Sequence, residues 1–331
     1  MRVLGIETSC DETAAAVVDD NYSVASSVVE SSIDQHRAFG GVVPELAGRA
    51  HLATLGPVVA EALARAGGSE RAPGVDGVAV TAGPGLVGSL LVGLSAAKAY
   101  AMAWGVPYVG VNHLEAHLVA PLLEDPGLAW PLLTLLVSGG HSVIVLQRAP
   151  GDYDVLGATV DDAAGEAYDK VARWLGLGYP GGPEIDRLSL EGDASALPLP
   201  ASMVGPGLDL SFSGVKTAVV RATERDPALR TADVAAAFQD AVAEQLMRKL
   251  TAALDAHPVA GLALAGGVAA NRELRARVTD LAASRGLGCH LPAPAMCTDN
   301  AAMVAAAGLH RLSAPSGLDL PARPGWGLGE P

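Results

Sequence analysis

The chain has 331 residues, of which 50% are hydrophobic and only 4% aromatic. Its 22 Lys and Arg stand against 36 Asp and Glu, and the resulting net charge of −14 opposes non-specific binding to nucleic acid or to an anionic membrane. The length suits two domains built on small aliphatic cores, and the scarcity of aromatics argues against an aromatic platform for stacking bases.

The cysteines and the N-terminal segment bear on the compartment. Cys10, Cys289 and Cys297 are an odd number without CxxC spacing, so neither a disulfide framework nor a structural zinc site is expected. The first strand runs straight into an acidic loop, and the longest apolar runs are interrupted by Gly, Pro or charge. We therefore expect a cytoplasmic protein without a signal peptide or a membrane span.

The first part of the chain alternates apolar runs with turn residues. The hydrophobic pattern predicts strands at 3–6, 13–18, 24–29, 74–81 and 106–111, and helices at 44–66 and 89–104. The turn after the first strand, 7–13, is unusual because it holds three carboxylates and three hydroxyls. The segment is thus predicted to be a βββαβα unit with a polar turn at its first strand end.

Two histidines follow the last of these strands. His113 and His117 are four residues apart, so on a helix they lie about 40° from each other and both imidazoles can reach one ion. Asn112 is a good N-cap, and Pro121 limits the helix to roughly two turns. Two interpretations are open at this point: half of a metal site, or two histidines that hydrogen-bond nearby backbone.

A second cycle of the same kind begins at residue 132. Strands are predicted at 132–137, 141–147, 153–159 and 259–265, and helices at 161–175, 232–257, 271–285 and 301–310. Residues 178–216 are rich in Gly, Pro and Ser and are predicted to be an inserted loop region over the site, and 318–331 is predicted to be a tail draped on the surface. We place an N-terminal lobe at 1–112 with 300–331, and a C-terminal lobe at 113–299.

The predicted fold class is α/β, with the βββαβα unit duplicated. This duplication resembles the two-lobed fold shared by actin, sugar kinases and heat-shock chaperone ATPases, the ASKHA fold. That architecture places ligands in the cleft between the lobes, where glycine turns at strand ends let phosphate approach backbone N–H groups. The fold alone does not establish a kinase.

Two glycine motifs stand at predicted strand ends. Ser138-Gly139-Gly140 is either an ordinary type I′ hairpin turn or a backbone cradle for a phosphate or acyl oxygen, with the Ser138 hydroxyl as a further donor. The run 265–271 joins a buried strand to a helix. At its end, Asn271 can cap the helix and can also bind a ribose hydroxyl.

Acidic residues cluster at the start of the predicted helix 161–175, with four carboxylates in 161–169. Acids in a first helical turn complement the helix dipole, but Asp169 lies too far along to be explained in this way. Asp169 and Asp186 can together present two carboxylates to the hydroxyls of a ribose.

The segment before the last helix offers a third metal ligand. Asp299 is either a helix cap or the residue that completes a His-His-Asp shell with His113 and His117, leaving positions open for substrate. Cys297 is a poorer candidate, because a thiolate beside two imidazoles favours a closed structural site.

Taken together and in order, these motifs resemble the TsaD family of tRNA threonylcarbamoyladenosine synthases, once labelled O-sialoglycoprotein endopeptidases. The matching segments cover the chain from residue 5 to the last helix and lie at 5–13, 83–88, 112–117, 137–141, 161–170, 179–183, 211–216, 266–271 and 297–300.

The resemblance implies transfer of a threonylcarbamoyl group from threonylcarbamoyl-AMP to the exocyclic amine of the adenosine 3′ to the anticodon of tRNAs that read ANN codons, with release of AMP. It implies that His113, His117 and Asp299 bind one divalent metal, Fe²⁺ or else Zn²⁺, and Mg²⁺ is possible with the nucleotide. The residues implied to hold the acyl-adenylate are Leu136, Val137, Ser138, Gly139, Gly140, Asp169, Gly182, Asp186 and Asn271.

The resemblance also implies partners, which the acidic charge makes reasonable for a tRNA enzyme. A TsaB-like paralogue and a TsaE-like ATPase are expected to assist tRNA recruitment, and no membrane is involved. Asp11 or Glu12 is the candidate general base, and their alternative role is to orient water or a second cation.

Other functions are weighed against the same residues. In HExxH proteases the glutamate follows the first histidine directly, whereas Glu115 lies about 200° around the helix from His113 and points away from the metal. A small-molecule kinase of the same fold would not need the two histidines. A non-catalytic TsaB-like scaffold would lack the His-His-Asp set that this chain contains.

Overall fold

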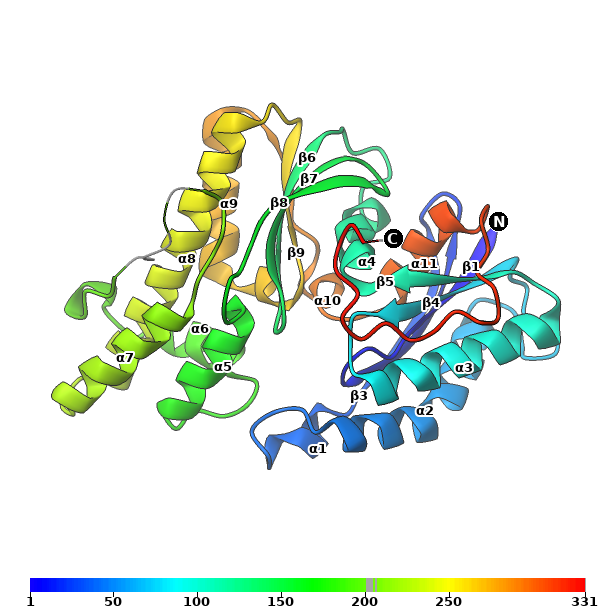
Figure 1. Ribbon diagram of the computed structural model, residues 1–331, viewed down its shortest axis with the longest axis horizontal. Coiled ribbons are helices and arrows are strands. Elements are labelled where there is room, and N and C mark those ends of the chain that lie inside the picture. The colour runs from blue at the N-terminus through cyan, green and yellow to red at the C-terminus, as the bar shows by residue number, and fades with distance from the viewer. Residues whose placement is uncertain (201–204, 206, 331) are drawn as a thin grey trace. The chain divides into compact units, whose positions relative to one another are not determined.

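The computed structural model describes residues 1–200, 205 and 207–330 (Figure 1). The chain divides into two compact units, the first made of Met1–Leu128 with Thr298–Pro331 and the second of Ala129–Cys297. The sequence places the first lobe's boundaries at 112 and 300 instead. The structure keeps the helix that carries His113 and His117 in the first unit, because this helix packs against the last helix of the chain, Ala301–Arg311.

The first unit is built on one mixed sheet. Its strands are β1 (Arg2–Glu7), β2 (Glu12–Asp19), β3 (Val24–Ser31), β4 (Gly77–Gly83) and β5 (Tyr108–Asn112). Their order across the sheet is β3-β2-β1-β4-β5; β1, β2 and β3 are antiparallel neighbours, and β4 and β5 continue the sheet in parallel with β1. Both parallel strands are buried along their whole length, as their continuous apolar runs predict.

Helices cover this sheet and carry the histidines. They are α1 (Ile33–Arg37), α2 (Pro44–Arg65), α3 (Val87–Trp104), α4 (His113–Val119), the 3-10 turn η1 (Ala120–Leu123) and α11 (Ala301–Arg311). Leu4 and Ile6 of β1 enter the core with α2 and α3, whereas Gly5 between them faces α11. A Cβ on Gly5 would lie 2.1 Å from the Ala301 carbonyl oxygen, so glycine is what allows α11 to approach the strand.

The second unit repeats this topology. Its strands are β6 (Leu132–Val137), β7 (Ser142–Ala149), β8 (Asp152–Ala158), β9 (Gly261–Ala265) and β10 (Gly288–His290), and their order is β10-β9-β6-β7-β8. In both sheets the order is therefore the third, second, first, fourth and fifth strand of the unit. The predicted duplication is confirmed.

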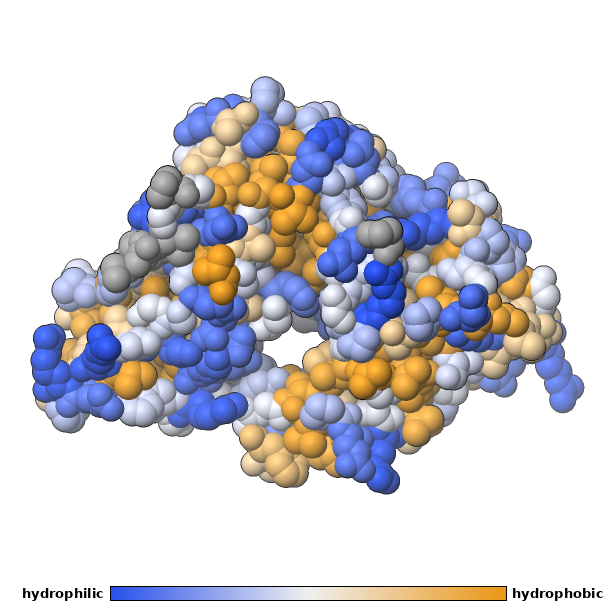
Figure 2. Space-filling view, in the orientation of Figure 1, coloured by the Kyte–Doolittle hydropathy of each residue, from blue (hydrophilic) through white to orange (hydrophobic). Residues whose placement is uncertain are grey.

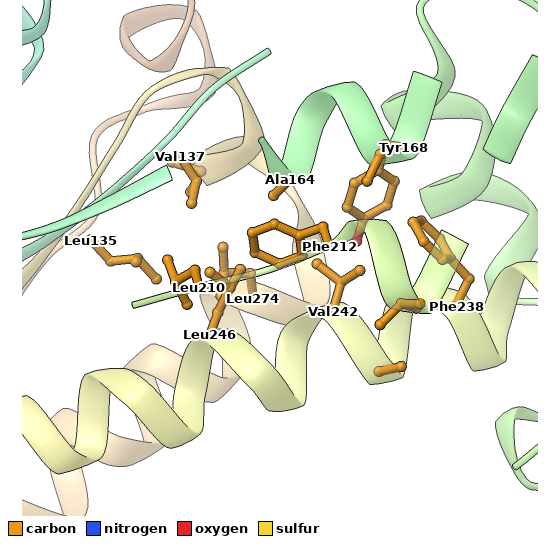
Figure 3. Close-up of a cluster of buried hydrophobic side chains, with 14 of the residues drawn as sticks. Leu135, Val137, Ala164, Tyr168, Leu210, Phe212, Phe238, Val242, Leu246 and Leu274 are labelled. Carbon is orange, nitrogen blue, oxygen red and sulfur yellow. The ribbon is translucent and has the colours of Figure 1, made fainter. Parts of the chain in front are cut away.

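The core of the second unit lies between its sheet and its helices. The helices are α5 (Ala164–Trp174), α6 (Gly181–Ser189), α7 (Ser213–Arg225), α8 (Thr231–Ala256), α9 (Arg272–Arg285) and α10 (Pro294–Cys297), with 3-10 turns η2 (Ala194–Ala196) and η3 (Gly267–Ala270). Figure 3 shows Phe212 in the middle of the cluster, between Ala164 and Val242. Tyr168 of α5 meets Phe238 of α8 edge to face, with ring centroids 5.1 Å apart.

The predicted loop region 178–216 is not a loop throughout, and this part of the prediction is wrong. It contains α6 and the start of α7, while residues 201–204 and 206 lie outside the described part of the chain. Gly181, Gly182 and Pro183 weaken the helical signal in the sequence. They stand in the first turn of α6, where the backbone N–H groups have no intrahelical partner and proline removes no hydrogen bond.

Through residue 330, where the description of the structure ends, the C-terminal tail has no helix or strand, as predicted, but it is pinned to the first unit. The Arg323 N–H donates to the Ala82 carbonyl over 2.7 Å, and the indole of Trp326 is buried. A Cβ on Gly83 would lie 1.9 Å from the Arg323 carbonyl oxygen, so the tail lies directly on the end of β4. The tail is part of the unit rather than a loose surface segment.

Helix α3 is more apolar than the interrupted pattern suggested. By length and composition alone it passes a test for a membrane-crossing helix, but only 33% of it is buried, and core helices of globular proteins pass the same test. It packs against α2 and β4. Its outer side leaves a groove of about 530 Å³ beside α2, lined by residues that include Leu52, Leu91, Val92 and Tyr100.

Candidate metal and nucleotide sites

Helix α4 begins where strand β5 ends, and Asn112 joins the two. Its side-chain oxygen accepts hydrogen bonds from the N–H groups of Leu114 at 2.9 Å and Glu115 at 3.3 Å, so the predicted N-cap is confirmed. Its amide nitrogen donates to the Trp326 carbonyl over 3.2 Å. The pinned tail thus helps to fix the start of the helix that carries both histidines.

The structure brings His113, His117 and Asp299 together. Their ligand atoms all lie within 4.8 Å of one another, and Asp299 Oδ1 is 3.4 Å from His113 Nε2 and 3.1 Å from His117 Nε2. Two ligands about 2.1 Å from one ion in tetrahedral geometry lie about 3.4 Å apart. The two distances to Asp299 are therefore close to those between the ligands of one metal ion.

Electrostatics at this cluster favour a cation. Burial raises the pKa of Asp299, but His113 and His117 lower it by more, so its carboxylate stays ionised. Burial also raises the pKa of Glu7 behind His113, and the imidazole again lowers it by more. Glu7 is fully buried, and Asp299 keeps 22% of its side chain exposed. Two carboxylates on either side of His113 are stabilised by positive charge between them, and a divalent ion on the three ligands would supply it.

His117 is held from one side of its ring only. Its Nε2 lies 3.1 Å from Asp299 Oδ1, whereas its Nδ1 is buried and, in the part of the chain that the structure describes, has no hydrogen-bond partner. Buried polar atoms of this kind are uncommon, and an ion on Nε2 would leave Nδ1 unpaired.

Glu115 lies off this cluster, as the helical spacing predicts. Its carboxylate pairs with Arg311 of α11, with Nε to Oε1 at 3.1 Å and a second contact between Nη2 and Oε2. The carboxylate is engaged in holding α4 on α11. A protease mechanism that uses it as a base is excluded by this geometry.

Asp11 and Glu12, the two candidates for a general base, follow the turn after β1. Burial raises the pKa of Glu12 to about 9, with further contributions from the carboxylates of Asp299 and Asp11. Glu12 also accepts a hydrogen bond from the Ser31 hydroxyl at 3.2 Å. The raised pKa favours the protonated Glu12 carboxyl at neutral pH, and in that form Glu12 donates a proton rather than accepts one.

In the second unit, the Ser138 turn connects β6 and β7. The last ladder pair is Val137 with Ser142, so 138–141 form a four-residue loop and the type I′ interpretation, which needs a two-residue turn, is wrong. The Ser138 N–H donates to the His141 carbonyl over 2.8 Å. A Cβ on Gly139 or Gly140 would meet no atom within 4 Å, so the backbone of this loop is open to a ligand.

Two further glycines hold that loop in place. Gly165 at the start of α5 lies so close that a Cβ would be 2.6 Å from the Ser138 carbonyl oxygen. Gly266 has a φ of +84°, and a Cβ there would be 2.4 Å from the Val137 carbonyl oxygen. The segment 138–140, the start of α5 and the turn after β9 therefore meet at one end of the second sheet.

The other predicted nucleotide ligands divide into three groups. Asp186 and Asn271 are brought together, because the Asn271 amide donates to Asp186 Oδ1 at 3.2 Å and its oxygen caps α9. Asp169 accepts the Gly181 N–H at 2.7 Å and so fixes the start of α6, next to Gly182. Leu136 and Val137 have fully buried side chains, so only their backbone is available to a ligand.

Some site residues escaped sequence reasoning. Glu7 and Thr81 lie behind His113, and Arg272 donates to Asp186 Oδ2 at 2.7 Å. Glu7 belongs to the acidic turn that the sequence marks as unusual, and Arg272 directly follows Asn271. Residues next to Glu7 and Arg272 were predicted to belong to a site. No local pattern, however, indicates that Glu7 or Arg272 itself would support a ligand.

Comparison with known proteins identifies the family of this chain. The chain matches the model of the TsaD family, described as tRNA N6-adenosine threonylcarbamoyltransferase, over residues 23–306. A protein of that name from Anaeromyxobacter dehalogenans (strain 2CP-C) is 53% identical over 99% of this chain and 99% of its own. Another, from Desulfitobacterium hafniense (strain Y51), is 52% identical over 94% of this chain and 92% of its own.

Solved structures with much lower identity share the fold. HypF of T. kodakarensis superposes with a TM-score of 0.64 at 14% identity, over 94% of this chain and 47% of that one. Component A of the Acidaminococcus fermentans (R)-2-hydroxyglutaryl-CoA dehydratase gives 0.55 at 13% identity, over 95% of this chain and 99% of that one. The predicted ASKHA fold class is confirmed. Near-complete coverage at about half identity shows that the chain belongs to the TsaD family of tRNA N6-adenosine threonylcarbamoyltransferases.

Proposed function

We propose that this chain transfers the threonylcarbamoyl group of threonylcarbamoyl-AMP to the exocyclic amine of the adenosine 3′ to the anticodon, in tRNAs that read ANN codons. A bond forms between the amine nitrogen and the carbamoyl carbon, the bond from that carbon to the phosphate oxygen breaks, and AMP leaves. The observation that carries the proposal is the convergence of His113, His117 and Asp299 in a TsaD-family chain.

The metal we assign to the three ligands is Fe²⁺. Two imidazoles and one carboxylate with open positions are typical of non-haem Fe²⁺ sites, and Zn²⁺ accepts the same donors. When bound, the ion supplies Lewis-acid stabilisation of charge on substrate oxygens, typically several kcal/mol. Mg²⁺ remains the expected companion of a bound nucleotide phosphate.

Residues of the second unit are assigned to the acyl-adenylate. The backbone N–H groups at Gly139 and Gly140 and the hydroxyl of Ser138 would donate to its phosphate or acyl oxygen, as oxyanion-type donors do. Asp186 would accept hydrogen bonds from the ribose hydroxyls, because its two oxygens keep free lone pairs beyond the contacts with Asn271 and Arg272. The remaining assigned residues contribute without side-chain contacts to the ligand. Leu136 and Val137 offer only their backbone, and Asp169 and Gly182 position the start of α6.

Proton handling is assigned to the first unit. The attacking amine is a weak base and loses its proton late, so an acceptor is needed as the new bond forms. Asp11 would take that proton, while Glu12, with its raised pKa, would hold its own and donate a hydrogen bond. The raised pKa of Glu12 is what supports Asp11 as the proposed base.

Partners and compartment follow from charge and surface. With a net charge of −14, the chain needs help to hold tRNA, and we propose a TsaB-like paralogue and a TsaE-like ATPase, acting in the cytoplasm. Apolar side chains gather over α2 and α3 in Figure 2, with Leu52 72% and Leu91 51% exposed. An exposed apolar surface of this kind supports a protein partner. Tight tRNA binding by the isolated chain that does not weaken with salt would contradict the need for partners.

The proposal is tested by a modification assay with purified threonylcarbamoyl-AMP and tRNA, with and without the partners. Wild type should form modified adenosine and AMP in equal amounts, and His113→Ala should form neither above background. Equal product from both chains would refute the metal site. Phosphorylation of small molecules from ATP would favour a kinase, and inactivity with all partners present would favour a scaffold.

A further inference from the structure

His113 is held on both sides of its ring. Its Nδ1 lies 2.9 Å from Glu7 Oε2, on the side away from the ligand cluster, and its Nε2 faces Asp299. Glu7 is the last residue of β1 and has no solvent exposure. A fully buried carboxylate therefore lies directly behind one proposed ligand.

Glu7 is itself fixed by the fold. Its Oε2 accepts a hydrogen bond from the Thr81 hydroxyl of the neighbouring strand β4 at 2.6 Å, and its Oε1 accepts the Ser9 N–H at 2.5 Å. Thr81 is fully buried as well. One donor comes from the adjacent strand and one from the turn, so the carboxylate has little freedom to turn away from His113.

This arrangement matches the tautomer that a metal-bound His113 needs. With an ion on Nε2, the one ring proton lies on Nδ1, where the Glu7 carboxylate accepts it over 2.9 Å. A carboxylate behind a ligating imidazole also makes the ring a stronger donor to a metal. His117 has no such support, since its buried Nδ1 finds no partner among the described residues.

We propose that Glu7 is the positioning residue of the metal site: it fixes the His113 tautomer and raises metal affinity, with Thr81 holding Glu7 in place. The inference rests on the proposed metal site and goes beyond it by naming the residues that set its affinity. Ser9 Oγ, 3.3 Å from His113 Nδ1, is the other group that could receive the proton. Glu7 is the shorter contact and carries the charge.

The test is a Co²⁺ titration of the metal-stripped, full-length chain, followed by the visible absorption of the bound ion. Glu7→Gln keeps the size of the side chain and removes its charge, and should raise the Kd for Co²⁺ by about 10- to 100-fold. Thr81→Val removes one of the two groups that hold Glu7 and should raise the Kd for Co²⁺ by about 3-fold or more. Glu115→Gln is the matched control, because Glu115 is also buried and lies between the two histidines, but pairs with Arg311.

The control separates positioning from general loosening of the fold. Glu115→Gln should lower the melting temperature and leave the Co²⁺ Kd and spectrum unchanged. Wild-type Kd and spectrum in Glu7→Gln would overturn the inference and leave the metal site standing. If Glu7→Gln does not fold, Thr81→Val decides, and a wild-type Kd there overturns the inference. Failure of the proposed metal site is a different result: wild type binds no Co²⁺, or His117→Ala binds it equally well.

Discussion

The candidate metal site in the first unit and the candidate nucleotide site in the second are formed by different kinds of chemical group. In the first unit, the site is made of buried ionisable side chains, with His113, His117 and Glu7 all at or below 8% exposure. In the second unit, it is made of backbone, held where glycines let segments approach one another, with Asp186 and Asn271 at its edge. A metal is selected by donor atoms of particular side chains, whereas a phosphate or acyl oxygen is bound by backbone N–H groups, which every residue except proline carries.

This difference predicts opposite responses to mutation. The first site should be sensitive to the chemical identity of side chains even when their size is kept. The second should be sensitive to added volume and to backbone conformation, and less so to side-chain chemistry. The changes below follow in order of expected effect.

The largest effect is expected from His117→Ala. Removing one of three ligands loses the ion and several kcal/mol of charge stabilisation, so transfer should fall by at least about 1,000-fold. Bound metal, measured by elemental analysis, should fall with it. His257→Ala, in the second unit, is the matched histidine control and should retain both. Full metal content in His117→Ala would contradict a first site that depends on the chemistry of its side chains.

A smaller but still large effect is expected from Gly266→Ala. The new Cβ meets the Val137 carbonyl oxygen at a positive φ, so the turn must shift and AMP binding should weaken by about 100-fold. Gly267→Ala places its Cβ where no atom lies within 4 Å and should bind AMP like wild type. Calorimetric titration with AMP measures both, and equal affinities of the two variants would contradict a site built on close backbone approach.

Asp186→Asn tests the one place where the second site depends on a side-chain charge. Hydrogen bonds to an ionised group are stronger than neutral ones, so AMP affinity should fall by about 10-fold. The sharper readout is the ribose: 3′-deoxy-AMP should bind wild type more weakly than AMP does, and the variant should discriminate less between the two. Unchanged discrimination in the variant would remove Asp186 from the ribose site.

The smallest effect is expected from Glu12→Gln. Glutamine has the shape of a protonated glutamate, and the raised pKa of Glu12 keeps its carboxyl protonated below about pH 9, so transfer at pH 7 should stay within about 3-fold of wild type. Asp11→Asn should lower the rate by 100-fold or more, as loss of a general base does. Single-turnover rates of modified adenosine measure both, and the reverse order would make Glu12 the base.

Much of the fold follows from local signals. The alternation and length of the apolar runs predict the strands of the duplicated unit. The helical spacing of His113 and His117 predicts that the two can converge and that Glu115 points away from them. Asn112 and Asn271 are recognisable as caps from their own position in the chain. These signals depend on residues within one or two turns of each other, where propensity and periodicity act.

Other features required the folded chain. Helix α6 begins with Gly181, Gly182 and Pro183, whose weak propensity is overridden because the helix packs against α5 and α8. The tail has no pattern of its own, and only contacts such as that of Trp326 with Asn112 give it a place. Glu7 lies 106 residues from His113, and Asp299 lies 182 residues from His117.

Such distant pairs depend on which strands become neighbours. Strand β1 pairs with β4, and β4 with β5, so the ends of the three strands bring Glu7, Thr81 and His113 to one edge of the first sheet. The sequence by itself therefore determined which residue types are available for a metal, an anion and a proton. The tertiary structure decided which carboxylate stands behind which histidine, because that depends on sheet order and helix packing across long stretches of chain.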